Sequence, residues 1–502
     1  MTRPNRLGCC LWTAAAMAFL NSSSAWAEPV TTPQLTTSET IGTVAQPRDM
    51  AAEIDREIEI LQGRQGGLTA AKAAEIAVSG GFDSIAAEQR ELAADSEVEA
   101  AKIRYTPKLN LSAGYTRLSS IDPPVIGTLV AAPGAVSDRP IGANQLLVAH
   151  SLSFPVLVNQ TTLRAQLIVP IMDYFVRFPQ LLDAAKDGKS VAHLSVVAQR
   201  ARISADARIA YYSWSRAVLQ HVTATQAHER TKTHFVDTQR LLEAGLATSA
   251  DVRSVEAQVA QAELLETRAA NAEAITLEQV RIQLRLPVDA KIEIGERVID
   301  VPALPAPMTL DVAWAEAQRS RPELLALAQN EQLLRHQADA ASGAELPRVD
   351  AFGEILTANP NSRYQPAVDA FKTTWALGVQ ATWSVNDFPA NAAARRGLVA
   401  QANAVAAQSN AMKQALRAEL VSSLRGVAQA RSTIAAASRG VQAAEAAYGV
   451  RKDLYLAGRA KSVELTDSET ELTRSRIDYI DALIDARIAT VRLEHALARD
   501  VK

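Results

Sequence analysis

The amino-acid sequence predicts a membrane protein of mixed α and β structure, built from two copies of one structural unit. Three observations lead to this prediction: a short motif occurs twice, each copy lies between long segments of helical composition, and each half contains two segments with alternating apolar and polar residues. A repeat on this scale overrides the three domains that about 150 residues per domain would suggest for 502 residues. We expect a first repeat at residues 68–286 and a second at residues 312–502, joined by a linker at residues 287–311.

The repeated motif predicts a tight turn between two helices. It begins at Leu241 in the first half and at Leu454 in the second. Glycine adopts the left-handed conformation that ends many helices, and a serine side chain can accept hydrogen bonds from the free amides that begin the next helix. We therefore expect a glycine to end one helix and a serine to cap the next. The two copies agree at Ala244/Ala457, Gly245/Gly458, Ala247/Ala460, Ser249/Ser462 and Glu256/Glu469.

Long helices are expected on both sides of each turn. Helical composition runs for about 66 residues before each glycine, which corresponds to about 100 Å at 1.5 Å per residue. The return helices, expected at residues 249–285 and 462–499, are about half as long. The helical segments at residues 68–104 and 312–342 are therefore expected to complete the column in each half.

Four segments alternate apolar and polar residues with a period of two, which is typical of strands with one apolar face. Between the first two segments we expect a long loop at residues 118–162. A strand from Trp375 to Trp383, tilted as in a barrel, rises about 20 Å, so these two residues and Tyr115 are candidate membrane-interface aromatics. An outer-membrane barrel fits the pattern, and so does a water-soluble sheet with one buried face. The four segments are residues 107–117, 163–171, 349–355 and 375–383.

The N-terminus has the three zones of a secretory signal. Basic residues precede an apolar run at residues 11–20, and Ala25-Trp-Ala27 follows it. We expect a cleaved signal peptide at residues 1–27, which would contain both cysteines, and a flexible extension at residues 28–67. No later segment offers the roughly 18 uninterrupted apolar residues of a spanning helix, so entry into a membrane would require strands.

The composition argues against nucleic-acid binding and catalysis. The net charge is −3 and aromatic residues make up 5% of the chain, so neither a basic surface nor stacking platforms for bases are indicated. His221, His228 and His234 share one predicted helix, but their spacing is too wide for metal ligands on adjacent turns, so we expect them on a solvated surface. We find no zinc-protease motif, phosphate-binding loop or nucleophile elbow. No catalytic residue, cofactor or metal is therefore predicted.

The order of helix, two strands, long helix, turn and helix, repeated twice, resembles the TolC-like family of outer-membrane efflux proteins. The resemblance covers residues 68–500 and rests on three features: Arg321-Pro-Glu-Leu324, Leu346-Pro347, and the paired turn glycines with an acid six residues later. The family's glycine-containing turn after the second strand of each half is missing, and the pairs Phe178-Pro179 and Phe388-Pro389 replace it. This difference affects the junction between strand and helix.

The resemblance implies a homotrimer in the outer membrane that extends into the periplasm. Its twelve strands, four per chain, would close one barrel, which continues as a coiled-coil tunnel of helices. Strand counting agrees, because four strands cannot close, eight make a barrel filled by side chains, and twelve leave a lumen. The implied partners are a periplasmic adaptor (membrane fusion) protein, an inner-membrane pump and outer-membrane lipid. The leading function is a passive exit duct for a tripartite efflux pump or type I secretion system. The alternative is a periplasmic structural or adhesin-like coiled-coil protein without a pore.

The resemblance also implies a periplasmic gate at the two turns. Tyr455 would bond to Asp251, while Glu464 and Asp467 would form an acidic ring that favours cations. Ala460 stands where the family has a second gate residue, an arginine. The small residues of the turns would permit an adaptor to approach closely, unless they serve only to close the turns. These candidate docking residues are Ala244, Gly245, Ala247, Ser249, Ala457, Gly458, Ala460 and Ser462.

Overall fold

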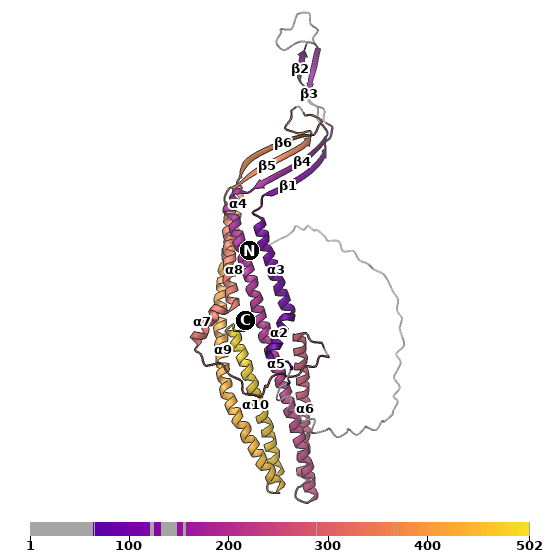
Figure 1. Ribbon diagram of the computed structural model, residues 1–502, viewed down its shortest axis with the longest axis vertical. Coiled ribbons are helices and arrows are strands. Elements are labelled where there is room, and N and C mark those ends of the chain that lie inside the picture. The colour runs from indigo at the N-terminus through magenta and orange to yellow at the C-terminus, as the bar shows by residue number, and fades with distance from the viewer. Residues whose placement is uncertain are drawn as a thin grey trace, which may run out of the picture. The chain divides into compact units, whose positions relative to one another are not determined.

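The structure is a computed structural model that describes residue 64 and residues 66–120, 125–131, 148–153, 157–287, 289–365 and 367–500. The predicted signal peptide and almost all of the predicted extension lie outside these residues. Each half of the described chain runs from two helices through strands to a long helix and a return helix, and β2, β3 and α4 of the first half have no counterpart in the second (Figure 1). The first half contains α2 (Ala70–Gly80), α3 (Phe82–Ile103), β1 (Lys108–Arg117), β2 (Val125–Ala131), β3 (Val148–Ser153), β4 (Asn159–Val169), α4 (Ile171–Phe175), α5 (Arg177–Glu243) and α6 (Ser249–Leu284). The second half contains α7 (Leu310–Ser320), α8 (Pro322–Ser342), β5 (Arg348–Asn359), β6 (Lys372–Thr382), α9 (Phe388–Leu456) and α10 (Ser462–Ala496).

The first helical segment of each half is broken into two helices. Ser320-Arg-Pro-Glu-Leu324 predicts the break in the second half, whereas the break in the first half was not predicted. Gly81 separates α2 from α3 and has an extended backbone. Arg321 separates α7 from α8 in the same way, and Pro322 occupies the first turn of α8, as its sequence predicts. The break at Arg321 has a clear cause, because a proline disfavours the helical conformation of the residue before it.

The long helices are continuous. Helices α5 and α9 contain 67 and 69 residues. Contacts link α5 to both α6 and α10, and α9 to α10, so the two helical hairpins pack side by side (Figure 1). Alanine supplies many of the buried positions on these helices, which allows narrow packing against two neighbours at once. Among the described residues, no helix is both long enough and apolar enough to cross a membrane.

The four predicted strands form one antiparallel sheet in the order β1-β4-β5-β6. The pairing of β4 with β5 joins the first half of the chain to the second. The prediction of a plain loop at residues 118–162 is wrong, because β2 and β3 pair there as a separate hairpin. Their segments are only 7 and 6 residues long, and their alternation was not evident beside the surrounding prolines and glycines.

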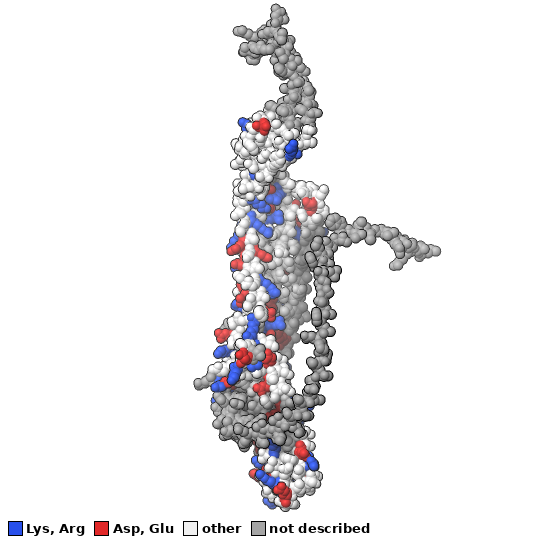
Figure 2. Space-filling model, turned by 90° about the vertical axis from the view of Figure 1, so that its right-hand side faces the viewer, with Lys and Arg blue, Asp and Glu red and all other residues white. Residues whose placement is uncertain are grey.

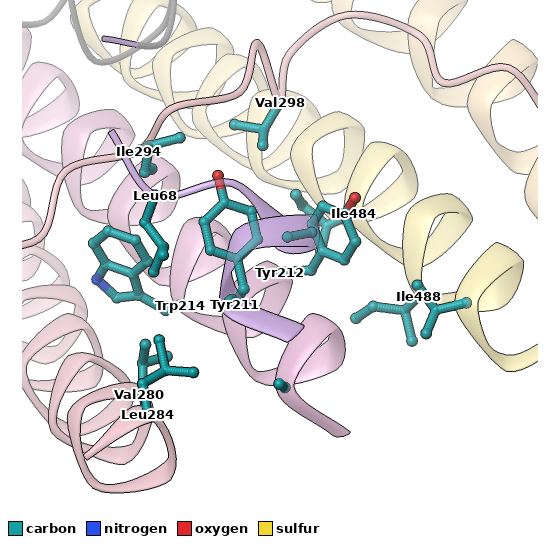
Figure 3. Packing of buried hydrophobic residues seen from close by; sticks show 14 of the residues in the cluster. Leu68, Tyr211, Tyr212, Trp214, Val280, Leu284, Ile294, Val298, Ile484 and Ile488 are labelled. Atoms are coloured by element: carbon teal, nitrogen blue, oxygen red, sulfur yellow. The ribbon is translucent and has the colours of Figure 1, made fainter. Parts of the chain in front are cut away.

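A cluster of buried aromatic residues holds the first half together. Tyr211, Tyr212 and Trp214 of α5 pack against Leu68, Ile294 and Val298 (Figure 3). Ile294 also forms a parallel bridge with Leu68. Segment 287–311 therefore lies against the helices. Ile484 of α10 enters the same cluster, so one core joins both hairpins and the segment between the two halves.

Candidate functional site

The turn between α5 and α6, here called the first tip, is closed by Gly245. Its φ is +76°, and the amide of Leu246 donates to the carbonyl of Leu241 over 2.8 Å, which is the Schellman arrangement. The residue that caps α6 is Thr248, not Ser249 as predicted. Thr248 Oγ1 accepts from the Asp251 amide (3.2 Å), and Asp251 accepts in return from the Thr248 amide (2.9 Å). The Thr248 hydroxyl also donates to the Asp251 carboxylate over 2.7 Å, and this bond together with the bond from the Thr248 amide lowers the pKa of Asp251. Ser249 is the first, exposed residue of the helix.

The turn between α9 and α10, here called the second tip, has the same backbone but a different start to its return helix. Gly458 has a φ of +72°, and the Arg459 amide donates to the Leu454 carbonyl over 2.8 Å. Lys461 occupies the capping position and makes no capping hydrogen bond through its side chain. The prediction that Ser462 caps α10 is therefore wrong, because Ser462 is the first helical residue.

The predicted docking residues fall into two groups. Most of them are exposed, but Ala247 and Ala460 are half-buried and Ser462 is buried. Ser462 therefore cannot serve as a surface contact in this conformation. Large apolar side chains, which were not among the predicted docking residues, lie exposed beside the small residues: Leu246, Leu456 and Val463.

The predicted bond between Tyr455 and Asp251 is not present in the described chain. Tyr455 is buried, and its hydroxyl lies 2.7 Å from Thr238 Oγ1. Asp251 is instead part of the cap at the first tip, so Tyr455 and Asp251 share no hydrogen bond within the described chain. Glu464 accepts a hydrogen bond of 2.6 Å from Arg451. Asp467 is exposed and has neither a hydrogen bond nor an ion pair among the described residues.

The three predicted surface histidines of α5 each face a glutamate, and so does His193 of the same helix, which lies 2.8 Å from Glu91 of α3. His221 lies 2.6 Å from Glu273, and His234 lies 3.2 Å from Glu469. The third pair is His228 with Glu266, at 2.5 Å. The predicted solvated surface is therefore wrong for His228 and His234, which are both buried.

The spacing of these histidines contained a signal that the sequence analysis did not use. Residues seven apart lie on one side of a helix, and His221 and His228 accordingly both face α6. Six residues further on, the helix has turned by about 120°, and His234 faces α10. Burial raises the pKa of Glu266, but hydrogen bonds from His228 and Thr225 outweigh it, so the net pKa is lowered. Among the described residues, no three His, Cys, Asp or Glu side chains are grouped so that they could hold a metal ion.

The register of the sheet places the predicted apolar residues on one face. Leu111, Ala165, Ile355 and Trp375 form one cross-strand row from β1 to β6. Large side chains on this face are exposed, and Trp375 exposes 77% of its surface. The other two predicted aromatics are also exposed: Tyr115 on β1, and Trp383 one residue beyond β6. Figure 2 shows few charges over the strands, and charges of both signs along the helices.

The opposite face of the sheet is polar. Glu354 lies between Arg164, at 3.4 Å, and Arg363, at 2.9 Å. Arg363 belongs to the segment between β5 and β6 and also donates to Thr374 over 3.1 Å. These contacts fasten that segment to the polar face of the sheet.

Residues 314–499 match the family model described as outer membrane efflux protein. No match was found among curated proteins. The fold is similar to that of the outer-membrane channel OprN, with 17% sequence identity, a TM-score of 0.67, and coverage of 92% of this chain and 98% of that chain.

Two further solved channels have similar folds. The Campylobacter jejuni CmeC outer membrane channel matches at 13% identity and a TM-score of 0.67, with 94% of each chain covered. The Neisseria gonorrhoeae MtrE outer membrane channel, in its open state, matches at 15% identity and a TM-score of 0.63, with coverage of 86% of this chain and 89% of that chain. At sequence identities this low, these structural matches show a shared fold alone.

Proposed function

We propose that this chain, a member of the outer membrane efflux protein family by the match of its second half, is the outer-membrane duct of an efflux pump or type I secretion system. One observation carries the proposal: a four-stranded sheet with an exposed apolar face adjoins helices of 67 and 69 residues. Strands of 10 to 12 residues, tilted by about 40°, rise about 25 Å, which matches the apolar band of an outer-membrane barrel. The match to a family of efflux proteins supports a passive duct without enzyme activity.

The duct is a homotrimer with a barrel of twelve strands. Within the described chain, β1 and β6 are the two edges of the sheet, and each leaves one side without a partner strand. Pairing of β6 in one copy with β1 in the next closes the barrel after three copies, and twelve strands leave a lumen. The apolar face then contacts lipid, with Tyr115, Trp375 and Trp383 at the membrane interfaces. The polar face, with Arg164 and Glu354, lines the lumen.

The tips face the periplasm and dock an adaptor protein, through which the duct connects to an inner-membrane pump. Exposed small residues, among them Ala244, Gly245, Ala457 and Gly458, permit close approach of helices from the adaptor. Leu246, Leu456 and Val463 add apolar area to the same surface. An exposed cluster of this kind on a polar helical protein marks an interaction site.

The periplasmic opening of the duct lies at the second tip. Glu464 and Asp467 stand three residues apart on α10, so they point in similar directions. In a trimer they form a ring of acids around a narrow opening, which raises the local concentration of cations. Tyr455 belongs to the same tip and contacts Thr238 of α5 through its hydroxyl. Asp251 stabilises the first tip as part of the α6 cap.

Cell fractionation followed by gel electrophoresis of unheated samples tests this function. The expected result is an outer-membrane protein that migrates as a detergent-resistant trimer and conducts ions in a planar bilayer. A soluble, elongated species without conductance would instead support the alternative of a periplasmic adhesin-like protein without a pore.

A further inference from the structure

A buried pair of ionisable residues connects the two helical hairpins close to their tips. His234 belongs to α5 in the first hairpin and Glu469 to α10 in the second, and their side chains expose only 2% and 5% of their surface. His234 Nδ1 lies 3.2 Å from Glu469 Oε2, so the imidazole donates to the carboxylate. Burial of a carboxylate is unfavourable unless such a partner compensates it.

Three other side chains complete this contact. The ring of Tyr455, from α9, meets the ring of His234 edge to face, with their centroids 5.0 Å apart. The Tyr455 hydroxyl lies 2.7 Å from Thr238, one turn after His234 on α5. Ser462 Oγ lies 3.4 Å from His234 Nε2. One histidine of the first hairpin therefore contacts both helices of the second.

Two neighbouring histidine pairs on α5 have the same chemistry but a different connection. His221 and His228 face Glu273 and Glu266, which both belong to α6. Each of these pairs lies within the first hairpin and would move with it as one body. Among the described His–Glu pairs on α5, the pair of His234 and Glu469 is the one that joins α5 to α10.

Separation of the hairpins at their tips would break the whole cluster at once. The Glu469 carboxylate would lose its donor, and Tyr455 would lose both its ring contact and its hydroxyl partner. A cavity of about 90 Å³ beside the cluster is lined by further charged and titratable groups, which face the pair from α5 and α9: Arg230, Asp237, Tyr448 and Lys452. The cluster therefore borders a small cavity with a polar lining.

We propose that His234, Glu469 and Tyr455 form a joint that holds the two hairpins together and thereby keeps the periplasmic end of the duct closed. The inference rests on the proposed function, since closure has meaning only for a duct. It assigns positioning roles to His234 and Glu469, which no sequence motif places at the gate. It also gives Tyr455 a partner other than Asp251.

Planar-bilayer recording of purified trimers tests the joint. Glu469→Gln, His234→Leu and Tyr455→Phe should each raise the open fraction by about tenfold, because each removes a contact of the closed state. His234→Asn, which keeps a side-chain N–H donor, should raise it less than His234→Leu. The matched controls are Glu266→Gln and Glu273→Gln, which remove the same chemistry within the first hairpin and should conduct like the parent.

The double variant with His234→Leu and Glu469→Gln supplies a second criterion. If both residues act through one contact, its open fraction should not exceed that of the stronger single variant. Parent-like conductance of both single variants in stable trimers would overturn the joint, and so would an equal effect of the two control variants.

Amide hydrogen exchange separates failure of the joint from failure of the proposed function. In Glu469→Gln, amides of α5 and α10 near the tips should exchange faster, whereas in Glu266→Gln those of α10 should not change. If the parent trimer does not conduct ions, the proposed duct is refuted, and amide hydrogen exchange is then the remaining test of the joint. Unchanged exchange in Glu469→Gln then overturns the joint as well.

Discussion

The two tips share a sequence motif but have opposite surroundings. Ser249 at the first tip is exposed, whereas its counterpart Ser462 at the second tip is buried against His234. Glu256 is exposed and pairs with Arg253 on its own helix, whereas its counterpart Glu469 is buried between the hairpins. The repeated motif therefore specifies a backbone turn, while packing of the hairpins sets the burial and the contacts of its side chains.

Substitution of both tip glycines should have the largest effect. Gly245→Phe with Gly458→Phe places side chains where no atom lies within 4 Å of the added Cβ, so the new rings project from the tips. The left-handed backbone costs an L-residue about 1–2 kcal/mol per position, which a long helical protein tolerates. Export should be abolished because the adaptor surface is blocked, while trimers persist on unheated gels.

The matched control for the glycines is asparagine at both positions, since asparagine tolerates the left-handed conformation and adds a smaller group. Its export should fall less. Normal export by the double phenylalanine variant would refute adaptor docking at the tips.

The acids of the second tip should differ in their effect on ion selectivity. Arg451 offsets the charge of Glu464, whereas Asp467 is exposed and unpaired among the described residues. Asp467→Asn should therefore lower the cation-to-anion permeability ratio by about twofold, and Glu464→Gln by less. Reversal potentials in a salt gradient measure both. Glu256→Gln at the first tip is the control. An equal change in the permeability ratio of this variant would show that ion selectivity is not set at the second tip.

The end of α10 should make stability depend on pH in a way that the end of α6 does not. The hydrogen bond of 2.8 Å to Asp500 raises the pKa of His495, so folding favours its charged form. This contribution is complete below pH 6.5, the ordinary pKa, and is lost as the pH rises through the raised value of the folded state. Below pH 6.5, His495→Asn should cost about 1.5–3 kcal/mol, the range for hydrogen bonds to charged groups.

Thermal unfolding followed by circular dichroism checks this dependence. The difference in midpoint between the parent and His495→Asn should shrink as the pH rises from 6 to 9. His193→Asn is a control on an exposed pair with Glu91, where a much smaller difference is expected. A difference that grows with pH would contradict the assignment.

The caps of the two return helices should respond in opposite directions. Thr248→Ala removes the acceptor for the Asp251 amide and should destabilise the first tip by about 1 kcal/mol. Lys461 occupies the capping position of α10 with an extended backbone and no capping side chain. Lys461→Ser should therefore stabilise the second tip by about 0.5–1 kcal/mol. Midpoints of thermal unfolding measure both changes, and a shift in the same direction would contradict the contrast between the tips.

Features that depend on local periodicity could be predicted without the structure. Alternation along residues 107–117 and 375–383 was sufficient to place β1 and β6, because successive side chains of a strand point to opposite faces. Gly245 and Gly458 were sufficient to place the turns, because few other residues adopt a positive φ. Pro322 was sufficient to begin α8.

Long-range packing, in contrast, sets which helical surfaces meet and what the polar side chains on them contact. The environments of His234, Glu469 and Ser462 are set by the packing of α5 against α10, more than 200 residues apart in the chain. Composition did not predict this packing, because histidine and glutamate also occur commonly on solvent-exposed helix surfaces. The pairing of β4 with β5 is likewise a long-range choice, which the local alternation of either strand cannot specify.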